Sequence, residues 1–283
     1  MLRSALLSAA LLSAAAAFAQ TQTFTVRTAD EFIAAIGPDR IIQIEGEGIA
    51  LSEADPEQSG AYYSFTEEYD GHELLISGVS NLKIIGIGDH PAKIITKPLY
   101  GDVIAFENCT GIRIEHVEAG HGPEKGQCTG GVFNFSGCAD IGITRSILYG
   151  SGTEGITADG ISGLQVTNSI IRGCTYSVMS LSGSKGIAFS DCEFSDNQEF
   201  DLVNVSGCLD VQFSRCTFRG NRTGTDDYSD YALLNVSGSK SVVFRECVFQ
   251  DNTAVYFAKQ ANAFELIAPS MSGNRFTQGR TRE

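Results

Sequence analysis

The chain contains an internal repeat with a period of about 23 residues. Each copy is a short alternating strand, a corner of two or three residues and a second alternating strand. Seven copies align: ELLISGVSNLKI, VIAFENCTGIRI, VFNFSGCADIGI, ITADGISGLQV, VMSLSGSKGIAF, LVNVSGCLDVQF and LLNVSGSKSVVF. Their corners are 30, 29, 23, 23, 24 and 31 residues apart, so three copies carry longer loops. This period is too short for a helical-hairpin repeat and suits one coil of three short strands.

Apolar residues recur at equivalent positions in three strands of the repeat. The first strand offers Phe106, Phe135, Leu181, Val205 and Val236, and the third offers Leu148, Ile171, Phe194, Phe218 and Phe249. The second strand repeats an Ile-x-Ile or Val-x-Phe pattern. Three inward ladders predict a three-sided tube. We therefore expect an all-β fold, a single-stranded right-handed parallel β-helix of about 7–8 coils over residues 40–276.

A short amphipathic helix precedes the first coil. The pattern predicts it over about residues 28–37, with Thr28 as its cap and Gly37 as its end. An open β-helix end exposes strand edges, so this helix is expected to cover the amino-terminal end. The segment 261–276 is less regular and is expected to form the last coil and its cover. Residues 20–283 are thus expected to form one domain.

The first 19 residues have the pattern of a secretory signal peptide. A short positive region is followed by an Ala/Leu-rich run, and cleavage is expected near Ala19-Gln20. No other stretch is long and apolar enough to span a bilayer. We expect a secreted or periplasmic protein. Its formal net charge of −14 disfavours nucleic acid and favours cationic partners or divalent metals, and it also aids solubility. The sequence leaves the oligomeric state open.

The eight cysteines fall into two groups. Six occupy repeat positions that face inward: Cys109, Cys138, Cys192, Cys208, Cys216 and Cys247. Small residues stacked inside the tube explain them. Cys128 and Cys174 fall in loops instead. Because export permits oxidation, a disulfide between these two is one interpretation, although other pairings remain open.

Several segments resemble a known superfamily. From DEFIAAIG through ELLISGVSNLKIIG to the FxxC and NVSG coils, the chain resembles the pectin-lyase-like right-handed parallel β-helix proteins. The stretches GHGPEKGQCTGGVFNF, LYGSGTEGI and EFDLVNV are similar to uncharacterised exported bacterial β-helix proteins. The resemblance implies the fold. It leaves the reaction open, because this scaffold hosts lyases, hydrolases, epimerases, adhesins and inert spikes.

Candidate chemistry lies in loops that follow the third strand of each coil. These loops, 119–131, 149–155, 172–177 and 196–201, leave the same corner and are expected to stack into one wall of a groove. The predicted catalytic residues are His121, Lys125, Glu154 and Glu199, with His121 or Lys125 as base and a glutamate as acid or metal ligand. The predicted substrate contacts are Arg172, Tyr176, Tyr149, Tyr228 and Tyr231. Solvated surface charges are the alternative reading of this wall.

Known catalytic motifs are incomplete. Gly120-His121-Gly122 is similar to a triplet of polygalacturonases, but the carboxylate motifs and the Arg-x-Lys segment of that family are missing around it. Pectate-lyase-like chemistry would need Ca²⁺, for which Glu124 and Asp201 are candidate ligands without a diagnostic spacing. Outward Asn134, Asn204 and Asn235 fit hydrogen bonds between coils or a carbohydrate-binding strip.

Three classes of function are compatible with this pattern. The first is an exported protein that binds a polysaccharide along the loop wall and processes it as a lyase or glycoside hydrolase. The second is a non-enzymatic surface or adhesive module. The third is a subunit whose acidic face docks a basic partner protein.

Overall fold

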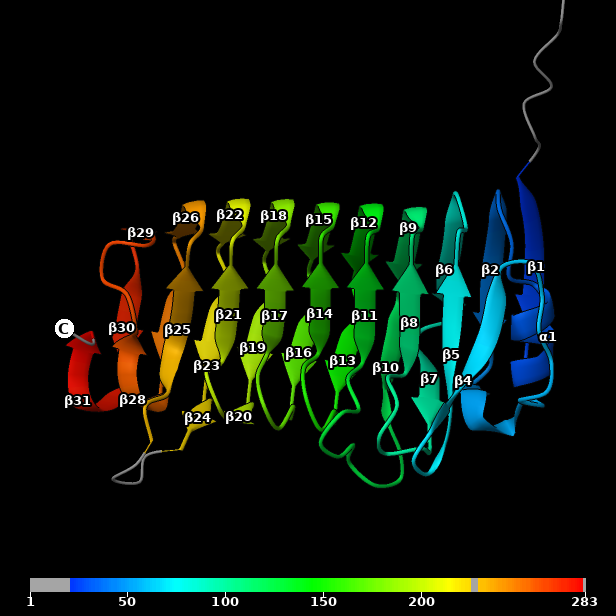
Figure 1. Cartoon of the computed structure of the whole chain (residues 1–283), viewed down its shortest axis with the longest axis horizontal. Coiled ribbons are helices and arrows are strands. Elements are labelled where there is room, and N and C mark those ends of the chain that lie inside the picture. Colours follow the sequence, from blue (N-terminus) through cyan, green and yellow to red (C-terminus); the bar gives the residue numbers. More distant parts are fainter. Residues whose placement is uncertain (1–20, 225–228, 282–283) are drawn as a thin grey trace, which may run out of the picture.

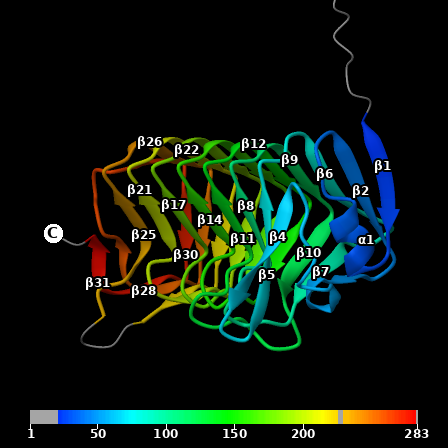
Figure 2. The ribbon, with the colours of Figure 1, turned by 45° about the vertical axis from the view of Figure 1, so that its right-hand side comes forward.

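The computed structural model describes residues 21–224 and 229–281. The signal peptide expected over residues 1–19 and the predicted contact Tyr228 lie outside this part of the chain. The described residues form a tube with three parallel sheets, which we call sheets A, B and C (Figures 1 and 2). Each coil runs through sheet C, then sheet A, then sheet B.

Sheet A has ten strands and is the most regular. In order along the tube they are β1 (Gln22–Val26), β2 (Arg40–Glu45), β6 (Leu82–Ile87), β9 (Thr110–Glu115), β12 (Ala139–Thr144), β15 (Ser162–Thr167), β18 (Lys185–Ser190), β22 (Leu209–Ser214), β26 (Lys240–Arg245) and β29 (Glu265–Ile267). Eight of these strands, from β6 to β29, belong to complete coils that also have a strand in each of the other two sheets, which agrees with the expected 7–8 coils. The first and last coils lack the repeat pattern, because insertions and short strands interrupt it there.

Sheet B has nine strands. They are β3 (Gly48–Ala50), β7 (Ala92–Thr96), β10 (Val117–His121), β13 (Ile147–Tyr149), β16 (Ile170–Arg172), β19 (Glu193–Ser195), β23 (Thr217–Arg219), β27 (Val248–Gln250) and β30 (Ser270–Ser272). A 3-10 helix, η1 (Leu51–Glu53), follows β3.

Sheet C has twelve strands. Its main path contains β5 (Gly71–Ser77), β8 (Ile104–Glu107), β11 (Phe133–Ser136), β14 (Ile156–Asp159), β17 (Met179–Ser182), β21 (Val203–Ser206), β25 (Ala232–Ser237) and β28 (Thr253–Ala258). At one end β4 (Tyr63–Glu68) pairs antiparallel with β5. At the other, β31 (Arg275–Thr281) pairs with β28, and the short β20 (Gln198–Glu199) and β24 (Arg222–Thr223) extend the sheet.

The helix α1 (Ala29–Ala34) covers the amino-terminal end, as expected (Figure 1). The Thr28 side chain accepts a hydrogen bond from the Glu31 N–H at 3.2 Å, which confirms the predicted cap. Phe32 and Ile33, on the inner face of this helix, are fully buried. The helix ends before Ala35 rather than at Gly37, so the predicted end was wrong.

The predicted inward ladders fill the tube. All residues named above for the first and third strands are buried, and the phenylalanine rings stack from coil to coil. The rings of Phe189, Phe213 and Phe244 lie 4.9 and 4.5 Å apart and are nearly parallel. The six cysteines expected inside are also buried. Burial of such rings supplies much of the hydrophobic stabilisation.

A ladder of buried asparagines runs along the corner between sheets B and C. Its members are Asn197, Asn221, Asn252 and Asn274. The amide nitrogens of Asn197, Asn221 and Asn252 each donate to the next amide oxygen at 2.9–3.0 Å and to a backbone carbonyl one coil back, and the half-buried Asn274 donates to Phe249 O alone. The ladder satisfies polar groups that the corner would otherwise bury without partners, and so fixes where the loops leave the tube.

Candidate functional site

The loops between sheets B and C stack on one another. Gly126 N donates to Gly150 O at 2.8 Å, Thr175 N to Ser151 O at 3.1 Å, and Phe200 N to Tyr176 O at 3.1 Å. These bonds continue the coil spacing out into the loops. The loops therefore form a row along the side of the tube where the strands of sheet C begin.

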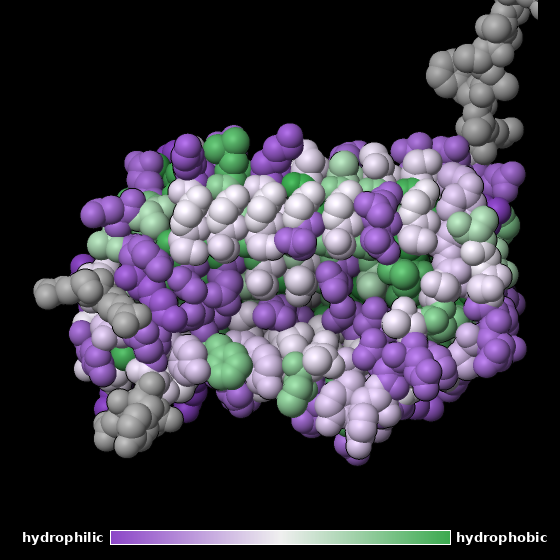
Figure 3. All heavy atoms as spheres, in the orientation of Figure 1, coloured by the Kyte–Doolittle hydropathy of each residue, from purple (hydrophilic) through white to green (hydrophobic). Residues whose placement is uncertain are grey.

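The outer face of sheet C carries a column of polar side chains, which we call the sheet C face. Strand register places these side chains opposite one another: Asn134, Thr157, Ser180, Asn204 and Asn235. Asn235 Nδ2 donates to Asn204 Oδ1 at 3.1 Å, so hydrogen bonds do join the coils here. Figure 3 looks onto this side of the molecule, where hydrophilic and weakly polar residues predominate.

Three aromatic rings border the sheet C face. Tyr176, Phe200 and Tyr231 lie in successive loops just before β17, β21 and β25, and we call them the aromatic edge. The ring centroids of Tyr176 and Phe200 are 4.6 Å apart, and those of Phe200 and Tyr231 are 5.0 Å apart. Phe200 is 39% exposed, which is unusual for a phenylalanine in this protein. The structure thus brings two of the predicted tyrosines together through a residue that sequence reasoning missed.

A polar network lies beside the aromatic edge. Asp201 Oδ1 accepts from the Ala232 N–H at 2.8 Å. Its Oδ2 accepts from Asn235 Nδ2 at 2.9 Å and from Lys259 Nζ at 2.7 Å. Lys259 Nζ also lies 5.7 Å from the centre of the Tyr231 ring. These contacts hold the edge and the face in one fixed arrangement.

Carboxylates gather at the other end of the sheet C face. Glu73 Oε2 accepts from the Asp102 N–H at 2.6 Å, and Asp102 Oδ1 accepts from the Gly131 N–H at 2.7 Å. A Cβ on Gly131 would lie 2.4 Å from Asp102 Oδ1, so a larger residue there would displace this carboxylate. Glu154 follows in the next coil and accepts from Ser177 Oγ at 3.2 Å.

Burial and mutual repulsion favour the protonated forms of these acids. Burial, followed by the charge of Asp102, raises the pKa of Glu73 to about 7. Burial also raises the pKa of Asp102, against a hydrogen bond from Asn134. The pKa of Glu154 is raised by burial too, while hydrogen bonds from Thr153 and Ser177 oppose the shift. This end of the face therefore takes up protons more readily than free carboxylates.

His121 is buried beneath the glycine-rich loop. It is the last residue of β10, is only 3% exposed, and its Nε2 lies 2.9 Å from Gly101 O. A Cβ at Gly126 or Gly130 would lie 3.0 Å from the imidazole ring, so the glycine-rich loop passes directly over it. Burial lowers the pKa of His121. His121 Nδ1 has no hydrogen-bond partner. The predicted role as a solvent-facing base is therefore inconsistent with its position.

Lys125 and Glu199 lie on the loop row. Burial lowers the pKa of Lys125, and the nearby Cys174 and Glu199 act in the opposite direction. Cys128 is exposed, and its thiol beside the Tyr176 hydroxyl raises the pKa of that tyrosine. Lys125 thus lies near Glu199, and Glu154 contacts the buried Ser177 in the loop before β17.

Tyr149 and Arg172 belong to a different face. Arg172 forms an ion pair with Glu118 at 3.0 Å, and its guanidinium lies 5.5 Å from the centre of the Tyr149 ring. These residues come from β10, β13 and β16, so the cluster lies on the outer surface of sheet B. Tyr149 and Arg172 thus contact each other and Glu118 on sheet B, and no contact joins them to Tyr176 among the described residues.

The predicted disulfide and metal ligands are also revised. Cys128 and Cys174 are both free, and Cys174 is buried against the tube rather than in an open loop. Within residues 21–224 and 229–281, no group of three or more His, Cys, Asp or Glu is arranged to hold a metal ion. Asp201 already binds Lys259, and Glu124 is an exposed loop residue. These residues do not fit a Ca²⁺ site, and Ca²⁺ dependence stays a prediction.

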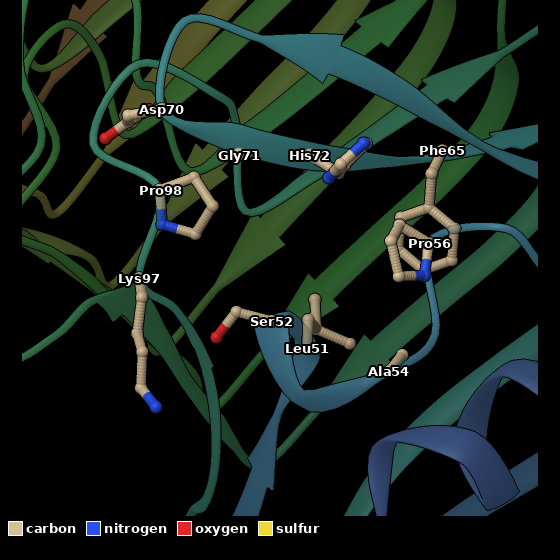
Figure 4. Close-up of a pocket in the computed structure, with 10 residues that line it drawn as sticks. All are labelled: Leu51, Ser52, Ala54, Pro56, Phe65, Asp70, Gly71, His72, Lys97 and Pro98. Carbon is tan, nitrogen blue, oxygen red and sulfur yellow. The ribbon is translucent and has the colours of Figure 1, made fainter.

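A cleft of about 260 Å³ lies near the amino-terminal end, apart from the residues above. It is bounded by η1, by the start of β5 and by Pro98. Figure 4 shows the Lys97 side chain extending away from Phe65 and Pro56. Asp70 at its margin accepts from the Leu99 N–H at 2.7 Å, so this acid holds the loop. None of the residues predicted from the sequence lines this cleft.

Comparisons with known proteins support the fold. Residues 130–280 match the family model described as a right handed beta helix region, and the chain belongs to this family. The fold is the right-handed parallel β-helix of the pectin-lyase-like superfamily. A search of curated proteins found no match. Within the part of the chain that the structure describes, no helix is long and apolar enough to cross a membrane.

Solved structures resemble the chain in fold alone. An alginate lyase from Paenibacillus sp. str. FPU-7 matches with a TM-score of 0.51 and 13% identity, over 93% of this chain and 100% of the lyase. A pectate lyase from Paenibacillus sp. 0602 matches with a TM-score of 0.48 and 8% identity, over 82% of this chain and 78% of that one. A surface adhesin of Streptococcus pneumoniae matches with a TM-score of 0.40 and 8% identity, over 92% and 89% of the two chains.

Proposed function

We propose that this protein binds a polysaccharide along the sheet C face, with the aromatic edge as its main contact. The observation that carries the proposal is the continuous contact of Tyr176, Phe200 and Tyr231, with Phe200 exposed. Burying a phenylalanine in the tube would stabilise the fold more than leaving it exposed. A row of rings left at the surface is typical of a binding surface.

The face beside the rings supplies the second half of sugar recognition. A pyranose ring has apolar C–H surfaces and hydroxyl groups that both donate and accept hydrogen bonds. Asn204 and Asn235 present amide groups next to the edge, and Ser180 and Thr157 present hydroxyls one and two coils away from Asn204. Amides and hydroxyls can pair with sugar hydroxyls, while the rings cover the apolar surface.

Binding without cleavage is the form of this function that the geometry favours. His121 is covered by the loop above it, and Arg172 binds Glu118 on sheet B. Lys125 and Glu154 both lie near the buried Cys174. A general acid and base must both reach one substrate bond, and the covered His121 is poorly placed for that. The non-enzymatic surface module is therefore favoured over the lyase or hydrolase. Export through the predicted signal peptide would place the protein where glycans are exposed.

A glycan array with the purified protein tests this function. We expect binding to one class of extended glycans, and loss of that binding in a Tyr176→Ala/Phe200→Ala/Tyr231→Ala variant. Tyr149→Ala is the matched control, because it removes a tyrosine from sheet B. An assay for new reducing ends and unsaturated uronates, with and without Ca²⁺, is run on the bound glycans. No binding to any glycan would refute the proposal. Formation of cleaved product would show that the protein is an enzyme and not only a binding module.

A further inference from the structure

We infer that Tyr69 and Tyr100 form a second sugar-binding subsite, on the same side of the tube as the aromatic edge. This inference rests on the proposed function and adds the length of the ligand to it. A protein that uses both groups of rings recognises a long stretch of polysaccharide, and a short oligosaccharide fills only one of them.

Tyr69 has the most exposed large hydrophobic side chain of the described residues. It is 87% exposed, whereas Phe200 in the aromatic edge is 39% exposed. Tyr69 lies in the turn between β4 and β5, and its ring contacts that of Tyr100 with centroids 5.1 Å apart. Two rings in contact at the surface offer a larger apolar area than a lone tyrosine does. Such an area fits the C–H face of a pyranose.

Backbone contacts hold the two rings in place. Asp70, in the hairpin turn, accepts a hydrogen bond from the Tyr100 N–H at 3.3 Å. A Cβ on Gly101 would lie 3.2 Å from Glu73 Cβ, so the loop before β8 packs closely on the β4–β5 hairpin. The pair is therefore preorganised, and a ligand that binds it does not have to order the loop first.

The glycine-rich loop, residues 122–131, joins this pair to the aromatic edge. Thr129 Oγ1 donates to Tyr100 O at 2.5 Å, and the thiol of the preceding residue, Cys128, lies beside the Tyr176 hydroxyl. Two neighbouring residues of one loop therefore contact both groups of rings. Because the pair continues the surface proposed to bind the glycan, the same glycan chain is the ligand that it fits.

The order of the strands gives the length of this surface. The aromatic edge spans two steps between adjacent strands, from the loop before β17 to the loop before β25, which is roughly 10 Å. Tyr100 precedes β8, which lies three steps, or roughly 14 Å, from β17. Asn134 on β11 and Thr157 on β14 present an amide and a hydroxyl in this interval. A chain long enough to touch both groups of rings thus meets polar partners between them.

Calorimetric titration with short and long probes tests the inference. The probes are cellotriose and cellohexaose, chitotriose and chitohexaose, and the trimer and hexamer of galacturonate. For the sugar that binds, we expect the hexamer to bind at least tenfold more tightly than the trimer, because only the hexamer reaches both groups of rings. Equal affinities would overturn the inference and leave the proposed function intact. Absence of binding by all six probes would overturn the inference, while the glycan array decides the proposed function separately.

Tyrosine variants separate a second subsite from a general gain of affinity with chain length. Tyr69→Ala/Tyr100→Ala removes both rings and leaves the backbone hydrogen bonds of Tyr100 in place. We expect it to weaken hexamer binding at least tenfold and trimer binding less than twofold, because the trimer occupies the aromatic edge. Tyr69→Phe keeps the ring and should bind the hexamer like the wild type. Tyr149→Ala, on sheet B, is the matched control and should leave both affinities unchanged.

The size of the loss with each probe decides the outcome. Equal losses for the trimer and the hexamer, or no loss for either, in a double variant that thermal unfolding shows to be folded, would overturn the inference. Tyr69→Ala alone repeats the test at a position that is 87% exposed, where the change does not disturb the fold. It should weaken the hexamer by a smaller factor than the double variant does and leave the trimer unchanged.

Discussion

Lys259 Nζ lies 2.7 Å from Asp201 Oδ2 and joins the end of β28 to the loop before β21. The two side chains are only 18% and 11% exposed, so water screens their charges weakly. Asp201 also accepts a hydrogen bond from the Ala232 N–H, at the point where the chain enters β25. This ion pair therefore anchors two coils beside the aromatic edge. It contrasts with the exposed pairs on other faces of the tube.

Removing one partner of this pair should destabilise the protein. In Lys259→Met the Asp201 carboxylate stays buried without its cation, and we expect the free energy of unfolding to fall by about 3 kcal/mol. Urea denaturation measures the change. Arg215→Met is the control, because Arg215 pairs with Asp191 at an exposed site, and we expect a much smaller loss there. Similar losses in the two variants would show that burial does not set the strength of the Asp201 pair.

The asparagine ladder should be costly to break in the middle. Asn221 is fully buried and donates to Phe194 O at 2.8 Å and to Asn252 Oδ1 at 3.0 Å. Leucine has a similar volume but removes the side-chain donor to Phe194 O and the side-chain acceptor of the buried Asn197 N–H. We expect Asn221→Leu to cost about 3 kcal/mol or more in urea denaturation. Asn274→Leu, at the half-buried end of the ladder, should cost less. The reverse order would contradict the ladder as the source of the stability.

Glu73 should make the stability depend on pH. Its pKa of about 7 in the folded protein exceeds the ordinary value of 4.5, because of burial and the charges of Asp102 and Glu68. The folded state therefore holds this proton more tightly, and the stabilisation is lost as the pH rises from about 4.5 to 7. At pH 8 we expect the free energy of unfolding of Glu73→Gln to exceed that of the wild type by on the order of 2 kcal/mol, after allowance for solvent screening. Urea denaturation measures this difference. Near pH 4.5 the two proteins should converge. A constant difference across this range would contradict the raised pKa.

Thiol counting checks the state of the cysteines. Cys128 is exposed and the other seven cysteines are buried and free. A colourless aromatic disulfide reagent should therefore label one thiol in the native protein and eight after denaturation, and Cys128→Ser should abolish the native reaction. A Cys128–Cys174 disulfide would instead give six thiols in denaturant. That count would restore the pairing that the structure does not form.

Much of the fold could be predicted from the alternation of apolar and polar residues alone. Inward residues such as Phe213 and Phe218 recur at fixed offsets, because each coil must place the same face toward the tube. The same rule could have corrected two site predictions. Val117 and Ala119 are inward, so His121 continues the inward parity of β10, and Tyr149 must point outward from sheet B because Leu148 points inward.

The remaining features depend on contacts that spacing does not encode. Cys174 lies inside because its N–H donates to Asn197 Oδ1 at 3.0 Å, and a run of asparagines after the third strand was the available signal. Phe200 and Lys259 come from loops of unequal length, so their approach to the sheet C face follows from loop stacking. Glu73 and Asp102 meet because the β4–β5 hairpin interrupts the repeat before β8.

The affinity of the aromatic-edge variant for the bound glycan tests the central claim most directly. Calorimetric titration of an extended glycan into the wild type, the Tyr176→Ala/Phe200→Ala/Tyr231→Ala variant and the Tyr149→Ala control gives three dissociation constants. The account predicts about a 100-fold weaker affinity for the triple variant, since three ring contacts contribute about 1 kcal/mol each, and little change for the control. Equal affinity of the folded triple variant and the wild type would contradict the proposal that the glycan binds along the sheet C face.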